Sequence, residues 1–197
     1  MKPKPNKGLE VHVDADFAGN WDAKECLDPD TARSRHGYFI FYEGCPILHK
    51  SQLQGEIALS STESEYNGLS YALRDAIPII ELLKEMKKEG FDVTGAKAKV
   101  HCKVFEDNSG ALEMAKTHKF RPRTKHLNVK LHHFRRYVDE TKEITIHEIN
   151  TKDQPADMLT KPLNWEDLNR HRRFAMNWPQ PQQKGIERVS TRKWKLK

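Results

Sequence analysis

Alternating apolar and polar residues predict strands in the first part of the chain. Residues 9–16, LEVHVDAD, alternate with the period of a half-buried strand. Residues 38–52, YFIFYEGCPILHKSQ, indicate two strands joined at Glu43-Gly44, which is a hairpin signal. Residues 56–60, EIALS, predict a further short strand. The polar residues 18–37 predict a long loop.

A helical period replaces this alternation after residue 60. Six apolar residues recur at three- and four-residue spacing and form one stripe: Tyr66, Leu69, Leu73, Ile77, Ile80 and Leu83. Pro78 should kink or split this helix, and Gly90 is a plausible stop. Ahead of the stripe, Thr62 and Glu65 have the spacing of a capping box, in which a hydroxyl and a carboxylate satisfy free amides at a helix start.

Strands and helices alternate in the rest of the chain. Residues 98–107 and 143–150 predict two more strands. The other periodic segments predict four helices, at 108–117, 126–140, 153–161 and 164–178. An early antiparallel meander followed by strands that alternate with helices predicts an α/β fold with a mixed sheet and helices packed on it.

The length of 197 residues and the changes in composition along the chain predict one domain with terminal extensions. We expect a Lys/Pro-rich linker at 1–8, a globular domain at 9–165 and a helical extension at 166–178. Residues 179–197 are basic and low in core-forming residues, which predicts a disordered tail. No apolar run approaches the ~18 residues of a membrane helix, and the N-terminus does not have the pattern of a secretory signal.

Charge and cysteine content narrow the class of protein. The formal net charge is +6, and residues 119–136 contain seven Lys or Arg and no acid. Such a positive segment makes nucleic acid the first partner to consider. Cys26, Cys45 and Cys102 are far apart and odd in number, so neither a disulfide framework nor a zinc site is expected.

Four acidic residues lie at the ends of predicted elements. Asp14 and Asp107 each close a strand, while Glu65 and Asp157 each lie in the first turn of a helix. Strand ends and helix starts can converge on one edge of a sheet. Four converging carboxylates would repel one another unless a cation lay between them, and Mg²⁺ prefers oxygen ligands of this kind.

Each acid also has a purely local explanation. Asp14 could begin a turn, Asp107 could cap the next helix, and Asp157 could favour the positive end of a helix. Glu65 could serve only the capping box. The residue pattern alone leaves these alternatives open.

Five segments occur in a fixed order between residues 9 and 165: VDADFAG, ALSSTESEY, FEDNSGALEMAK, RTKHLNVKLHHFRR and INTKDQPADMLTKPL. In this order they resemble the ribonuclease H (RNase H) domain of Ty1/copia-type retrotransposon Pol polyproteins. The resemblance implies an RNase H-like fold, with a five-stranded mixed sheet and helices on both faces. It also implies cleavage of the RNA strand of RNA–DNA hybrids during reverse transcription, with two Mg²⁺ ions, for which Mn²⁺ can substitute.

The same resemblance implies partners and a location. The partners would be the RNA–DNA hybrid and the reverse transcriptase domain of the same polyprotein, with no membrane. The location would be a cytoplasmic virus-like particle or the nucleus, and the protein would not be secreted.

The family's four catalytic and metal-binding acids fall on Asp14, Glu65, Asp107 and Asp157. Asp16 is the alternative to Asp14. Glu65 is preferred to Glu63 because the family places the glutamate before a bulky apolar residue, and because Glu65 lies nearer the apolar stripe. Glu63 is then expected at the surface.

Cellular RNases H carry a histidine in the loop before the last catalytic aspartate. Here that loop is NTKDQPA and contains none, while His147 lies inside a predicted strand. The resemblance therefore leaves the route of proton transfer open.

Two sets of residues are candidates for nucleic-acid contacts. Four polar residues adjoin the acids and could bind sugar or phosphate, or could simply cap helices: Ser61, Thr62, Asn108 and Ser109. Six others lie in the positive segment and could contact phosphates, or form a solvated helix face: Arg121, Arg123, Lys125, His126, Lys130 and His133.

Two other functions compete with hybrid hydrolysis. The chain could be a non-catalytic nucleic-acid-binding module derived from a retroelement, although all four acids are present. It could also be a DNA-directed member of the same broad fold, such as an integrase or resolvase, which the motif order argues against.

Overall fold

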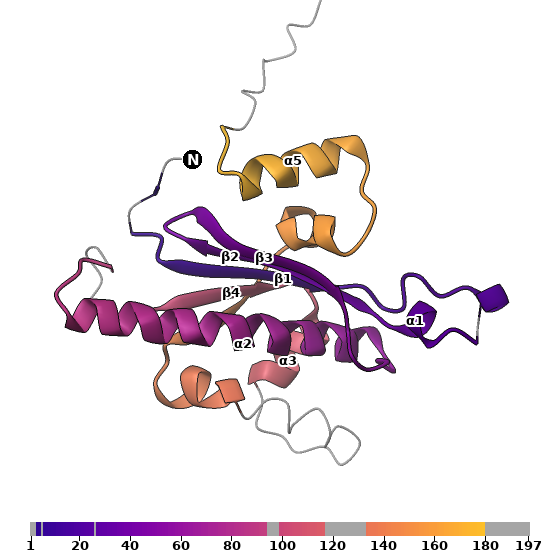
Figure 1. Cartoon of the computed structure of the whole chain (residues 1–197), viewed down its shortest axis with the longest axis horizontal. Helices are drawn as coiled ribbons and strands as arrows, with labels where there is room; N and C mark the ends of the chain where they lie inside the picture. Colours follow the sequence, from indigo (N-terminus) through magenta and orange to yellow (C-terminus); the bar gives the residue numbers. More distant parts are fainter. Residues whose placement is uncertain (1–2, 5, 26, 94–98, 117–132, 180–197) are drawn as a thin grey trace, which may run out of the picture.

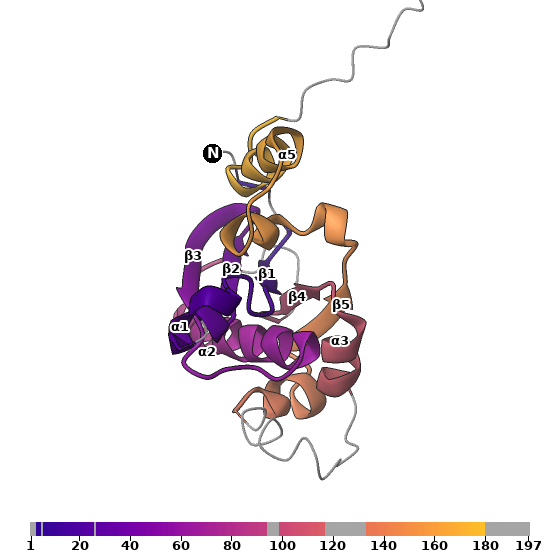
Figure 2. The ribbon, with the colours of Figure 1, turned by 90° about the vertical axis from the view of Figure 1, so that its right-hand side faces the viewer.

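A computed structural model describes residues 3–4, 6–25, 27–93, 99–116 and 133–179. Within these residues one mixed sheet, seen with α2 along it in Figure 1, has the strand order β3-β2-β1-β4-β5 (Figure 2). Its strands are β1 (Leu9–Ala15), β2 (Arg35–Tyr42), β3 (Cys45–Leu53), β4 (Cys102–Glu106) and β5 (Ile144–Glu148). β1, β2 and β3 pair antiparallel, whereas β4 is parallel to both β1 and β5. The predicted mixed sheet is confirmed.

Helical elements cover both faces of the sheet (Figure 2). One face carries α2 (Ser61–Lys88), α3 (Ser109–Lys116) and a π-helical turn, η3 (Arg136–Glu140). The opposite face carries a 3-10 helix, η5 (Pro155–Leu159), and α5 (Trp165–Ala175). The predicted arrangement of helices on both faces is therefore confirmed.

The main core lies between the sheet and α2. Leu9, Val11 and Val13 of β1 are buried against the apolar stripe of α2, which includes Leu69 and Leu73. A smaller cluster on the opposite face joins Phe39 and Phe41 of β2 to Ala175 of α5, with Met158 and Leu159 of η5 packed beside it. The alternation of β1 and β2 therefore places the intervening polar residues of β1 on the face that carries η5.

The hairpin between β2 and β3 forms as predicted. Glu43 and Gly44 both have positive φ, 51° and 73°, as a tight turn between right-twisted strands requires. The further strand predicted at 56–60 is wrong. β3 ends at Leu53, and a bend leads from there into α2.

Two other loop and helix predictions also need correction. Residues 18–37 are not only loop, because they include a 3-10 turn, η1 (Ala23–Glu25), a short helix, α1 (Pro29–Ala32), and the start of β2. The helix predicted at 153–161 forms as η5, after a separate 3-10 turn, η4 (Thr151–Asp153). The few residues between Pro155 and Pro162 leave little room for a cooperative α-helix.

The long helix runs unbroken through Pro78, which is exposed. The predicted split is therefore absent. Of the helix predicted at 126–140, residues 126–132 lie outside the described residues, whereas Phe134 is buried in the main core. Among the described helices, none is long and apolar enough to cross a membrane. The division into linker, domain, extension and tail stays a prediction.

Candidate active site

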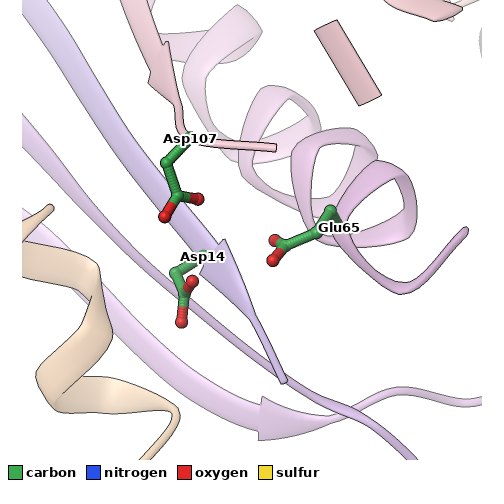
Figure 3. A group of neighbouring side chains, drawn as sticks. All are labelled: Asp14, Glu65 and Asp107. Carbon is green, nitrogen blue, oxygen red and sulfur yellow. The ribbon is translucent and has the colours of Figure 1, made fainter. Parts of the chain in front are cut away.

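Three acidic side chains from three elements point at one another (Figure 3). Asp14 is near the end of β1, Asp107 directly follows β4, and Glu65 lies on α2. Carboxylate oxygens of the three residues lie within 4.8 Å of one another. Because β1 and β4 are neighbouring parallel strands, Asp14 and Asp107 lie together at the C-terminal ends of these strands. Glu65 reaches the same place from α2, which packs on one face of the sheet.

The start of α2 separates the roles of the two glutamates. The N-cap is Ser60, whose hydroxyl accepts from the Glu63 amide at 3.1 Å. The Glu63 carboxylate accepts from the amide of Leu59 at 3.0 Å. The capping pair is thus Ser60 and Glu63, so the predicted pair of Thr62 and Glu65 is wrong. Glu63 is only 8% exposed, so its predicted surface position is also wrong.

Glu65 lies more than one turn after the N-cap residue Ser60 and takes no part in capping the helix. Its Oε2 accepts a hydrogen bond of 2.7 Å from the amide of Ala15, directly after Asp14 in the chain. This contact fixes the carboxylate against the end of β1. Burial, together with the charges of Glu106, Asp14 and Asp107, raises the pKa of Glu65 to about 11.

Asp157 lies beside Asp14 but outside the group of three. Gln154 fastens its segment to the sheet, because the amide Nε2 donates to the carbonyls of Val13 and Phe105 at 2.8 and 3.3 Å. Thr160 completes the attachment, since its hydroxyl donates to the Asp14 carboxylate. Burial and the charge of Asp14 raise the pKa of Asp157 to about 7.

Lys161 supplies a positive charge at the site. Its Nζ lies 3.1 Å from Asp157 Oδ1 and 3.7 Å from Asp14 Oδ1. Although burial opposes the charged form, the two carboxylates raise the pKa of Lys161. Even so, burial raises the pKa of Asp14. One lysine therefore compensates the acids only in part.

The donor set fits a hard divalent cation. It consists of carboxylate oxygens only, which is the chemistry Mg²⁺ selects. The neighbouring acids raise the pKa of Glu65, and the ammonium group of Lys161 is paired with Asp14 and Asp157. Asp14, Glu65 and Asp107 could hold one ion, and Asp157 could share a second with Asp14.

Asp16, the alternative to Asp14, has a structural task. Its Oδ1 accepts from the amide of Arg35 at 2.5 Å, which closes the loop between β1 and β2. Asp16 is also absent from the group of converging acids among the described residues. The geometry therefore favours Asp14.

The four polar residues predicted beside the acids lie at two adjacent helix starts. Ser61 and Thr62 begin α2, and Ser109 begins α3. A Cβ on Gly110 would lie only 2.7 Å from Thr62 Oγ1, so glycine permits the two helix starts to approach each other. The Asn108 side chain accepts from the Ala111 amide at 3.0 Å, which gives this residue a capping role.

Most of the predicted phosphate contacts lie outside the described residues: Arg121, Arg123, Lys125, His126 and Lys130. His133 is described and exposed. It lines a cavity of about 550 Å³ together with Tyr71 and Arg74 of α2.

Sequence reasoning missed Gln154, Thr160, Lys161 and Glu106. Lys161 follows Asp157 at the i,i+4 spacing of an ion pair, which is a usable signal. Glu106 is fully buried, and its Oε1 accepts from the Asn108 amide at 3.1 Å. Burial raises the pKa of Glu106 well above its ordinary value. The alternation of β4 places Glu106 on the same buried face as Cys102 and Val104, which is a usable signal.

Known proteins resemble this chain in fold and in sequence. LC11-RNase H1, isolated from compost by a metagenomic approach, superimposes with a TM-score of 0.53 at 16% identity, over 78% of this chain and 92% of that one. The retrovirus-related Pol polyprotein from transposon TNT 1-94 of Nicotiana tabacum is 33% identical over 153 residues, 78% of this chain. That from transposon RE1 of Arabidopsis thaliana is 32% identical over 164 residues, 83% of this chain. The chain belongs to the retrovirus-related Pol polyproteins of transposons, and it has the RNase H-like fold.

The chain corresponds to a small part of these relatives. The matches cover 10% of the length of each Pol polyprotein. No family model matches the chain. The sequence relationship therefore identifies the family of the chain. The activity of the chain has to be argued from its own residues.

Proposed function

We propose that this RNase H domain hydrolyses the RNA strand of RNA–DNA hybrids with two divalent metal ions. One observation carries the proposal: Asp14, Glu65 and Asp107 come from three separate elements, yet their carboxylate oxygens lie within 4.8 Å of one another. Such a cluster is costly to bury, so a fold that retains it needs a cation there or a function for it. Asp157 of η5 lies beside Asp14 and would extend this cluster.

The protein's own residues have distinct tasks in this proposal. When bound, a pair of Mg²⁺ ions would activate water and stabilise the leaving oxygen of a phosphodiester. The Ala15 amide holds Glu65, and the Thr160 hydroxyl holds Asp14, so the acids are oriented before any ion or substrate arrives. Gln154 fixes η5, and thereby Asp157, against the strand ends.

The substrate preference rests on the polar residues beside the acids. Ser61 and Thr62 lie within about one turn of Glu65 at the start of α2, and Ser109 follows Asp107 by two residues at the start of α3. Hydroxyl groups and helix-terminal amides are suited to phosphate and to the 2′-hydroxyl that distinguishes RNA from DNA. The positive segment 119–136 would add affinity that does not depend on sequence. The reverse transcriptase of the same polyprotein would supply the hybrid.

The route of the proton remains a separate question. The described loop from Asn150 to Ala156 contains no histidine, and His147 lies in β5, with its Nε2 2.7 Å from the Thr145 hydroxyl. We therefore assign His147 no catalytic role.

The test is hydrolysis of a hybrid whose RNA strand carries an end label, with Mg²⁺ present. Duplex RNA and duplex DNA of the same sequence serve as controls. The proposal expects cleavage of the hybrid alone, and loss of cleavage in Asp107→Asn. Cleavage that persists in Asp107→Asn would remove the proposed site. Salt-sensitive binding of the hybrid without cleavage under Mg²⁺ or Mn²⁺ would favour the non-catalytic alternative.

A further inference from the structure

Two exposed tryptophans flank an arginine on the sheet face opposite α2. Trp165 begins α5 and is 67% exposed, while Trp178 follows that helix and is 45% exposed. The guanidinium carbon of Arg172 lies 5.6 Å from the ring centroid of Trp165 and 5.8 Å from that of Trp178. The three side chains form one surface, named here the Trp–Arg surface.

The Trp–Arg surface contributes little to the packing of the domain. α5 packs on the sheet through other residues, since Ala175 and His171 of this helix are buried. An exposed indole gains little from folding, and soluble domains seldom expose several large aromatic side chains in one place. The arrangement therefore indicates a surface that binds something.

The charge of the surface limits what that partner can be. Arg170 forms an ion pair of 2.6 Å with Asp167. Within the described part of the chain, neither Arg172 nor Arg173 has an ion pair. Arg173 also lines a hollow of about 340 Å³ together with Trp178 and Lys4. Positive charge that lacks a described carboxylate partner thus lies directly beside flat aromatic faces.

We propose that the Trp–Arg surface binds single-stranded nucleic acid, with bases stacked on Trp165 and Trp178 and phosphates held by Arg172 and Arg173. A strand carries a flat base and a negative charge on every nucleotide, so it matches both features of the surface. An apolar protein partner would instead desolvate Arg172 without providing a counter-charge. Stacking of this kind tolerates any base sequence. The surface does not use the carboxylate cluster, so this binding does not depend on the proposed hydrolysis.

The test compares two labelled single strands of about 12 nucleotides, a length suited to one such site. One strand carries bases and the other is abasic, so their affinity ratio isolates stacking from charge attraction elsewhere on the chain. Fluorescence anisotropy with the full chain should give a ratio of about 5-fold or more. The double variant Trp165→Ala/Trp178→Ala should lower the ratio to about one. Trp165→Phe/Trp178→Phe should retain part of it.

Matched controls keep the result specific. Trp21 is 57% exposed in the loop after β1, so Trp21→Ala removes an exposed indole elsewhere and should leave the ratio unchanged. Asp107→Asn should also leave it unchanged, which separates this binding from cleavage. An unchanged ratio in the double alanine variant would overturn the proposal. A wild-type ratio of one would also overturn the proposal, because bases would then add nothing to the affinity.

Discussion

At the scale of single residues, two glutamates two positions apart have different tasks. Glu63 accepts from the Leu59 amide and completes the cap of α2, whereas Glu65 turns toward Asp14 and Asp107. The sequence correctly indicated that Glu65 meets the acids, but it also assigned the capping box to Glu65 and placed Glu63 at the surface. It could not locate the N-cap, because Ser60, Ser61 and Thr62 are all good capping residues. Only the tertiary position of the helix start selects Ser60.

Substitution of each glutamate should separate these tasks. Glu65→Gln should lower kcat/KM for hybrid cleavage by more than about 100-fold, because a direct metal ligand matters at least as much as its outer-shell partners. Glu63→Ala should retain cleavage but lose about 1 kcal/mol of stability, as expected for loss of a cap. Urea unfolding and initial cleavage rates measure the two effects. Equal loss of activity in both variants would contradict the assignment.

The pKa of Glu65 leads to a second prediction at this scale. Burial and the neighbouring acids raise that pKa from 4.5 to about 11. Between these values the folded, metal-free protein holds a proton that the unfolded chain does not. The contribution of Glu65 to stability is therefore fully present below pH 4.5 and is lost as pH rises toward 11.

Because a metal ligand must be deprotonated, binding of Mg²⁺ at pH 7 should release about one proton. Titration calorimetry in buffers of different ionisation enthalpy measures that release. Glu65→Gln should release fewer protons than the wild type. Magnesium binding without proton release in the wild-type protein would show that Glu65 is already ionised.

At the scale of elements, strand pattern predicted the sheet well and 3-10 helices poorly. β1 and the β2–β3 hairpin follow their alternation and turn residues. η5 is held instead by tertiary contacts: Gln154 bonds to two strands, and Thr160 bonds to Asp14. Such contacts join residues more than forty positions apart, so no local pattern could reveal them.

Gly37 of β2 provides a test of how η5 is seated. A Cβ there would lie 2.5 Å from Leu159 Cβ and 3.0 Å from Thr160 Cγ2. Gly37→Ala should push η5 from the sheet, lower stability by about 1–3 kcal/mol and reduce cleavage by displacing Asp157. Gly55→Ala is the matched control, since its Cβ would meet only Tyr71 Oη at 3.6 Å. Full activity in Gly37→Ala would show that the position of η5 does not matter.

At the scale of the whole molecule, the fold gathers acids that are up to 143 positions apart in the printed sequence. The parallel pairing of β1 with β4 aligns Asp14 and Asp107, and α2 crosses the sheet so that Glu65 meets them. The family resemblance predicted that these acids form one site. The hydrophobic periodicity alone predicted only that each acid lies at the end of a strand or the start of a helix. The ion pair of Lys161 with Asp157 has a local signal in the i,i+4 spacing, whereas the contact of Lys161 with Asp14 depends on how η5 packs on the sheet.

The most direct test of the metal site is crystallography with Mn²⁺, whose anomalous scattering locates each ion. The account predicts one ion among Asp14, Glu65 and Asp107, and, with a hybrid bound to an inactive variant, a second near Asp14 and Asp157. Lys161 should then leave its position between those two aspartates. Ions elsewhere on the protein, with the carboxylate cluster empty at millimolar Mn²⁺, would contradict the central claim.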